Sequence, residues 1–193
     1  MQKWIACSLL LLCSAVPAAA QAVSASSQET SRIELSVGYT LVHSNAPPAN
    51  CGCFSMNGGT GAVAFHLAKG LSAVADFTAA YNGNVDSSGQ SLLLASYLFG
   101  PRYSLRNWSR FTPFGEAFAG EAHGSGLGYS GTTGPATAFA TAVGGGLDFR
   151  ANRHVAVRLL EADYYFTHFQ NAVNSRQNNL RLTFGVVFGF GRR

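Results

Sequence analysis

Charged residues are scarce in this chain. Only 11% of its 193 residues are charged, whereas about a quarter of the residues of a soluble domain normally are. Lysine is almost missing, because the chain contains only Lys3 and Lys69. Apart from Arg192-Arg193, the arginines are scattered singly, without the basic runs or aromatic-interleaved patches that bind nucleic acid. The composition therefore excludes nucleic acid as an expected partner and is unusual for a soluble domain.

Long apolar runs are missing after residue 20. Before it, Lys3 precedes an apolar run from Trp4 to Val16, and three alanines end at Ala20. This pattern is typical of a secretory signal peptide, since an uncleaved anchor needs about 20 apolar residues. We expect cleavage after Ala20, a polar leader over residues 21–31 and one folded domain over residues 32–191. Without a helical span, that domain could cross a membrane only as a β-barrel.

Cysteine is also rare. Cys7 and Cys13 would leave with the signal peptide, and the leucine before Cys13 argues against a lipoprotein site. Cys51 and Cys53 remain, and export favours their oxidation. A disulfide between them is the favoured interpretation. A metal site is the alternative, but it needs further ligands and the nearest is His43. We expect no cofactor and no bound metal.

What the chain has instead is alternation with period two, which predicts strands with one apolar and one polar face. Residues 32–41 and 180–190 alternate most strictly. Six more strands are expected between them, over Gly61–Ala68, Leu71–Asn82, Ser91–Tyr103, Phe111–Ala122, Thr137–Arg150 and Val155–Phe169. The last of these changes parity between Arg158 and Asp163, and a β-bulge near Leu160 would restore the pattern.

The connections alternate in length, and this predicts the topology. Long loops are expected at Ser44–Gly59, Asn82–Gln90, His123–Pro135 and Gln170–Asn178, and short ones at Lys69–Gly70, Ser104–Arg110 and Ala151–Arg153. Four long loops on one rim and three short turns on the other describe an all-β fold, an eight-stranded antiparallel up-and-down transmembrane β-barrel. In bacterial outer membranes the short-turn rim is periplasmic.

The two faces of the predicted strands differ in size. One carries bulky Leu, Phe and Val, whereas the other is mostly small or polar, and the lumen of eight strands is only just wide enough for side chains. The bulky face is therefore expected to meet lipid, and a soluble lipocalin-like barrel is the alternative. Aromatic girdles are expected at both rims. They would contain Tyr103, Trp108, Phe111, Phe149, Phe188 and Phe190 at the short-turn rim, and Tyr39, Tyr81, Tyr165 and Phe169 at the other.

Three features carry a family resemblance: the order of these strands, the segments Gly100-Pro101-Arg102-Tyr103 and Ala162-Asp163-Tyr164, and the final strand Leu180–Phe190. In these features the chain resembles the outer-membrane β-barrel family of small porin-like and outer-membrane-protein-A-type barrels, over about residues 30–191. The resemblance implies residence in the lipid bilayer of the bacterial outer membrane. It also implies insertion by barrel-assembly machinery that reads a terminal aromatic residue. Here Gly191-Arg192-Arg193 follow, so Phe188 or Phe190 would have to serve as that signal.

Charged residues on the predicted lumen faces are the candidate site. They are Glu34, Asp76, Glu116, Asp148, Arg158 and Arg181. Charges in a narrow lumen must pair, because an unpaired buried charge is costly. The favoured interpretation is a plug of salt bridges, and the alternative is an ion pair that gates a small pore.

Catalysis is not expected. His43-Ser44-Asn45 superficially resembles the His and Ser of a lipid A deacylase, but that pattern has a residue between the two. A nucleophile also needs a base and an orienting acid in reach. We expect a role in envelope integrity or surface interaction through an extracellular ligand, with at best weak passage of small solutes. A lipid-modifying enzyme is the alternative.

Overall fold

The computed structural model describes most of the chain after the leader. The described residues are 31–46, 52–85, 91–106, 110–126, 136–169 and 176–191. The expected signal peptide and its cleavage after Ala20, nearly all of the polar leader, Cys51 and Trp108 lie outside these ranges. They stay predictions.

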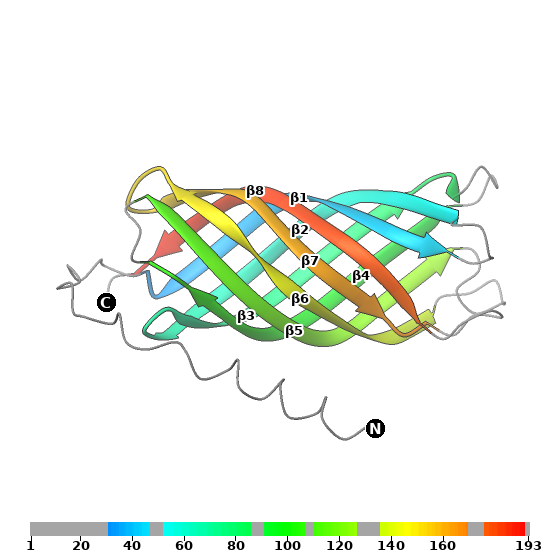
Figure 1. The fold of residues 1–193 in the computed structure, drawn as a ribbon, viewed down its shortest axis with the longest axis horizontal. Coiled ribbons are helices and arrows are strands. Elements are labelled where there is room, and N and C mark those ends of the chain that lie inside the picture. Colours follow the sequence, from blue (N-terminus) through cyan, green and yellow to red (C-terminus); the bar gives the residue numbers. More distant parts are fainter. Residues whose placement is uncertain are drawn as a thin grey trace, which may run out of the picture.

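Eight strands form one closed barrel in chain order, and every neighbouring pair is antiparallel (Figure 1). The strands are β1 (Ile33–Ala46), β2 (Gly52–Ala68), β3 (Leu71–Asn82), β4 (Leu92–Ser104), β5 (Phe111–Gly126), β6 (Ala136–Arg150), β7 (Val155–Thr167) and β8 (Gln177–Phe190). β1 closes the barrel on β8, with Ile33 opposite Phe190. The predicted fold class is confirmed. Within the described part of the chain, no helix is both long and apolar enough to cross a membrane.

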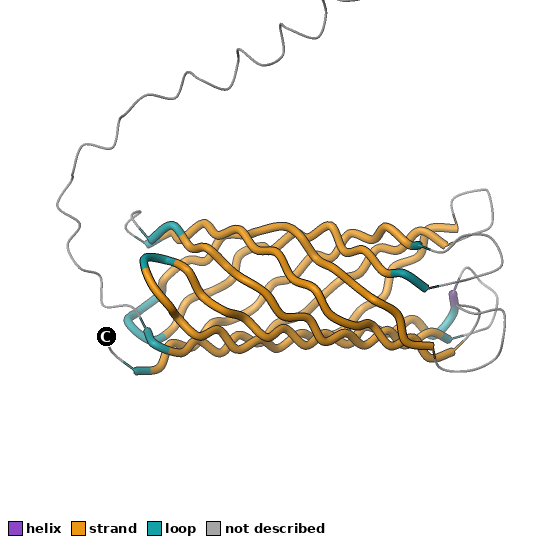
Figure 2. The backbone as a smooth tube through the Cα atoms, turned by 90° about the horizontal axis from the view of Figure 1, so that it is seen from below, coloured by secondary structure: helices purple, strands orange, loops and turns teal. Residues whose placement is uncertain are grey.

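Short turns join β2 to β3, β4 to β5 and β6 to β7 at one rim, which also holds the start of β1 and the end of β8 (Figure 2). In the tightest turn both Lys69 and Gly70 have positive φ, 42° and 87°. Such turns match the twist of two adjacent strands. The other four connections lie at the opposite rim, which we call the long-connection rim. Three of them have nine residues each, 83–91, 127–135 and 168–176, whereas only residues 47–51 join β1 to β2.

The first of the predicted long loops is wrong. β1 continues to Ala46 and β2 already begins at Gly52, so most of the segment Ser44–Gly59 is strand. Residues 57–61 are Asn, Gly, Gly, Thr and Gly. They pair through their backbones with β1 and β3, but they carry no bulky side chain that alternation could reveal.

The bulky apolar face points outward along all eight strands. Its large side chains are exposed or partly exposed, up to 57% for Phe99 of β4. Tyr39, Tyr81 and Tyr103 are outward as predicted. A lipocalin-like barrel would bury this face, so the soluble alternative does not fit the orientation of the strands.

The lumen is more apolar than predicted. Its half nearer the long-connection rim contains a cluster of buried large side chains, which we call the apolar layer: Val42, Phe54, Met56, Leu92, Leu94, Leu98, Phe118, Tyr165 and Phe169. β4 contributes most because the segment Ser91–Tyr103 is apolar on both faces, one toward lipid and one toward the lumen. The expectation of a lumen lined mainly by small and polar side chains holds only in part.

A β-bulge interrupts β7 between Arg158 and Glu161, as predicted near Leu160. Leu159 and Leu160 are both exposed on the outer face. Beyond the bulge the inward positions are the odd-numbered ones, so Tyr165 and Phe169 are buried, 1% and 2% exposed. Their predicted place in an outer aromatic girdle is therefore wrong. Tyr164 occupies the outer face instead, where its hydroxyl donates to Asn178 Oδ1 at 2.6 Å.

Candidate functional site

Arg181 of β8 is the centre of an ion-pair network inside the barrel. It is 1% exposed. Its Nη1 lies 2.6 Å from Asp76 Oδ1 of β3, and its Nη2 lies 2.8 Å from Asp163 Oδ2 of β7. Nη1 also donates to Thr78 Oγ1 at 3.1 Å. One guanidinium thus connects three strands across the lumen, β3, β7 and β8.

Arg158 occupies the same network from the other side of the β7 bulge. Its Nε and Nη2 donate to Asp148 Oδ1 and Oδ2 at 2.9 and 3.3 Å, a two-pronged contact with β6. Its Nη1 donates to Glu161 Oε2 at 2.6 Å. The bulge makes this second contact possible, because it returns Glu161 to the inward face that Arg158 already occupies.

Arg102 of β4 completes the network. Its Nε donates to Glu116 Oε2 of β5 at 2.6 Å. The ring of Phe114 contacts two guanidinium groups, with Arg102 Cζ at 4.7 Å and Arg158 Cζ at 4.6 Å from the ring centroid. Aromatic faces attract cations in this geometry. We call the set the ion-pair layer: Asp76, Arg102, Glu116, Asp148, Arg158, Glu161, Asp163 and Arg181.

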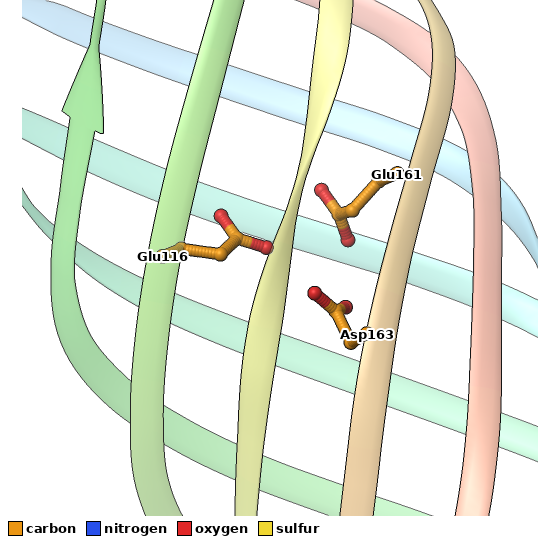
Figure 3. Close-up of side chains that lie close together, drawn as sticks. All are labelled: Glu116, Glu161 and Asp163. Atoms are coloured by element: carbon orange, nitrogen blue, oxygen red, sulfur yellow. The ribbon is translucent and has the colours of Figure 1, made fainter. Parts of the chain in front are cut away.

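Three carboxylates meet at the centre of this layer. Glu116 reaches over from β5, and Glu161 and Asp163 from β7 (Figure 3). They offer ligand oxygens that all lie within 4.8 Å of one another. A cation would find oxygen ligands here, but Arg158 lies 2.6 Å from Glu161, and Arg102 and Arg181 each lie 3.7 Å from it. The guanidinium groups already supply the positive charge, so the arrangement is an ion-pair network.

Gly144 of β6 makes room for these carboxylates. It lies opposite Glu116 on one side and Asp163 on the other. A Cβ at this position would overlap the carbonyl oxygen of Ala162 and Oδ1 of Asp163. The absence of a side chain at residue 144 therefore lets β5 and β7 bring their acids together.

The structure places all six predicted lumen residues on inward faces. Glu34 pairs near the short-turn rim with Arg106, at 2.6 Å between Oε1 and Nη2. The other five belong to the ion-pair layer. Sequence reasoning missed Arg102, Arg106, Glu161 and Asp163. Arg102 and Asp163 lie in the two segments that carry the family resemblance, and the inward position of Glu161 depends on the β7 bulge.

Cys53 and His43 lie near the long-connection rim. Cys53 is disulfide-bonded, and Cys51 lies outside the described residues, so their pairing stays a prediction. Ser44 points into the lumen and is buried, whereas His43 is outward. The His43 ring instead shares a hydrogen bond with Ser55 Oγ, at 3.0 Å from Nδ1. The His43–Ser44 pair considered from sequence is therefore separated by the strand itself.

Comparison with known proteins finds likeness in fold. No family model matches the chain, and no curated protein does. Neisserial surface protein A is 18% identical over 83% of this chain and 98% of its own, with a TM-score of 0.64. The Yersinia pestis attachment invasion locus protein Ail, solved with the heparin analogue sucrose octasulfate, is 14% identical over 83% and 99%, with a TM-score of 0.57.

The N-terminal β-barrel domain of Pseudomonas aeruginosa OprF is 12% identical over 84% of this chain and all of its own, with a TM-score of 0.53. At these identities the likeness is one of fold. It confirms the predicted resemblance to small outer-membrane barrels.

Proposed function

We propose that this chain is an integral β-barrel protein of the bacterial outer membrane, with a closed lumen and a function performed by its surface at the long-connection rim. The observation that carries the proposal is the filling of the barrel. The ion-pair layer and the apolar layer follow one another along the barrel axis and involve side chains from all eight strands. Eight strands leave little further space inside.

The lipid bilayer is the proposed partner of the outer face. Exposed bulky apolar side chains on every strand are costly in water and favourable in lipid. Tyr39 and Tyr164 hydrogen-bond to the outward Asn57 and Asn178, which fits a polar boundary toward the long-connection rim. Phe188 and Phe190 are exposed near the end of β8. They are available as the aromatic signal for barrel-assembly machinery.

A catalytic role is not proposed. His43 contacts Ser55, but none of the described carboxylates forms a hydrogen bond or ion pair with His43. A serine nucleophile needs both a base and a group that orients it. The inward acids are occupied by arginines, on the opposite side of the barrel wall.

The closed lumen predicts the absence of conductance. Purified protein in planar lipid bilayers should give no stepwise current, because an ion would have to displace buried ion pairs and then cross the apolar layer. Neutralising Asp148→Asn should not change this result. A general porin inserted in the same bilayers serves as the positive control. Regular current steps in the wild type that change with D148N would instead support the gated pore.

If the surface at the long-connection rim performs the function, variants should lose ligand binding while the barrel still assembles in the membrane. The full chain should be found in the detergent-insoluble outer-membrane fraction, and its gel migration should shift on boiling. Replacing residues 127–135, which connect β5 to β6, by a short Gly-Ser linker should leave both properties unchanged. Binding of expressing cells to immobilised sugars and matrix proteins should fall only in variants with shortened connections. A soluble periplasmic protein, or binding that survives shortening of all four connections, would contradict the proposal.

A further inference from the structure

A cavity of about 360 Å³ opens at the short-turn rim, on the side of the ion-pair layer away from the apolar layer. We call it the vestibule. Most of its wall is inward-facing side chains from β1, β4, β5, β6, β7 and β8, and the β6–β7 turn contributes Asn152, Arg153 and His154. Its volume is far above the roughly 10–15 Å³ that a single water needs. The space is large enough for a ligand of several heavy atoms.

The charge of the vestibule is unbalanced. Four arginines and two acids line it. Glu34 is paired with Arg106, and Asp148 is paired with Arg158 in the floor. Arg102 is paired with Glu116. Arg150 and Arg153 remain, and among the described residues neither forms an ion pair within 4.0 Å, so the wall of the vestibule carries an excess of positive charge.

The backbone that carries these two arginines is held by hydrogen bonds. Asn152 Oδ1 accepts from the backbone N–H groups of His154 and Val155 at 2.8 and 2.9 Å, which holds the β6–β7 turn. The N–H of Arg150 donates to the carbonyl of Arg110 at 2.7 Å. Ligand binding would therefore have to order the two side chains but not the backbone that carries them.

We propose that the vestibule binds a phosphate group, held by the guanidinium groups of Arg150 and Arg153. Guanidinium groups bind phosphate through two parallel hydrogen bonds, which a single ammonium cannot provide. Nε of Arg106 is buried without a hydrogen-bond partner and adds a donor in the same wall. Ser104 and Thr112 supply neutral hydroxyl groups there. The ligand is either the headgroup of an inner-leaflet phospholipid or a free phosphate compound.

A periplasmic position of this site rests on the proposed outer-membrane location and on the expectation that the short-turn rim is periplasmic, whereas phosphate binding by the vestibule depends on neither. Phosphate binding is therefore measured on the full folded chain in zwitterionic detergent, by calorimetric titration with inorganic pyrophosphate. The wild type should bind saturably. The double variant Arg150→Gln/Arg153→Gln should bind at least about tenfold more weakly, as expected for the loss of charge-assisted hydrogen bonds. Arg176→Gln, an exposed arginine at the other rim, is the matched control and should bind like the wild type.

The source of the phosphate is identified by repeating the titration in lipid nanodiscs. If a headgroup occupies the vestibule, pyrophosphate should bind more weakly in phosphatidylcholine discs than in a sulfobetaine detergent, which contains no phosphate. Equal binding in discs and in detergent identifies a free phosphate compound. The gel shift on boiling verifies that each variant is folded. Failure of the wild type to bind saturably, or equal binding by the wild type and the double variant, would overturn the proposal, whatever the barrel's location in the cell.

Discussion

Replacing Arg181 by methionine should reduce the free energy of unfolding by about 3–5 kcal/mol, the range found when one partner of a buried ion pair is removed. Methionine keeps much of the side-chain volume but leaves Asp76 and Asp163 without their guanidinium partner. Both carboxylates are buried, 2% and 0% exposed. Unfolding in urea, followed in detergent micelles by circular dichroism and by the gel shift on boiling, measures the loss.

Two further variants test whether the lost stability comes from the broken ion pairs or from the removal of any arginine. Arg176→Met changes an exposed residue immediately before β8 and should leave stability nearly unchanged. The triple variant Arg181→Met/Asp76→Asn/Asp163→Asn removes the unpaired charges and should recover most of the lost stability. A triple variant no more stable than R181M would mean that packing around residue 181, and not its charge, holds β3, β7 and β8 together.

The barrel itself could be predicted from the sequence because its two faces differ in chemistry. Residues 32–41 and 180–190 alternate without a break, and they become the paired strands β1 and β8 that close the barrel. Alternation fails where side chains are small. The start of β2 was expected to be loop because its glycines carry no face preference, although their backbones pair on both sides.

The candidate site was less predictable because ion pairs join distant parts of the chain. The six predicted residues share only the property of falling on inward faces, and nothing in their spacing indicates their partners. Arg181 and Asp76 are 105 positions apart. Which residues form ion pairs depends on which strands face each other across the lumen and on the bulge in β7. One extra residue at that bulge decides that Glu161 and Tyr165 are inside and Tyr164 outside.

The apolar layer shows a second limit of the sequence pattern. A strand that is apolar on both faces, such as β4, does not reveal which face meets lipid. Leu98 is fully buried and lies opposite Asp76, whereas its neighbour Phe99 is 57% exposed. The ion-pair layer and the apolar layer therefore touch at Leu98. The apolar contact also limits access of water from that side, which strengthens the neighbouring ion pairs.

Replacing Gly144 by alanine should prevent stable assembly of the barrel, with a loss of more than about 4 kcal/mol, a size reached only by severe core defects. The new Cβ would overlap the carbonyl oxygen of Ala162 and Oδ1 of Asp163, and it would lie 2.7 Å from Cα of Asp163. Two of these atoms belong to the backbone of β7, so a change of rotamer cannot relieve the overlap. The measurement is the fraction of protein that shows the gel shift on boiling after refolding into micelles.

Gly115→Ala is the matched control, because residue 115 lies on the outer face of the adjacent strand β5. Its Cβ would come no closer than 3.8 Å to a neighbouring atom, the carbonyl oxygen of Gly144. Full gel shift is expected for this variant. In Gly144→Ala/Asp163→Ala the carboxylate overlap is removed while the backbone overlap remains, so assembly should stay impaired. Wild-type stability of G144A would show that β6 and β7 can move apart, and that the close approach of Glu116, Glu161 and Asp163 does not depend on this glycine.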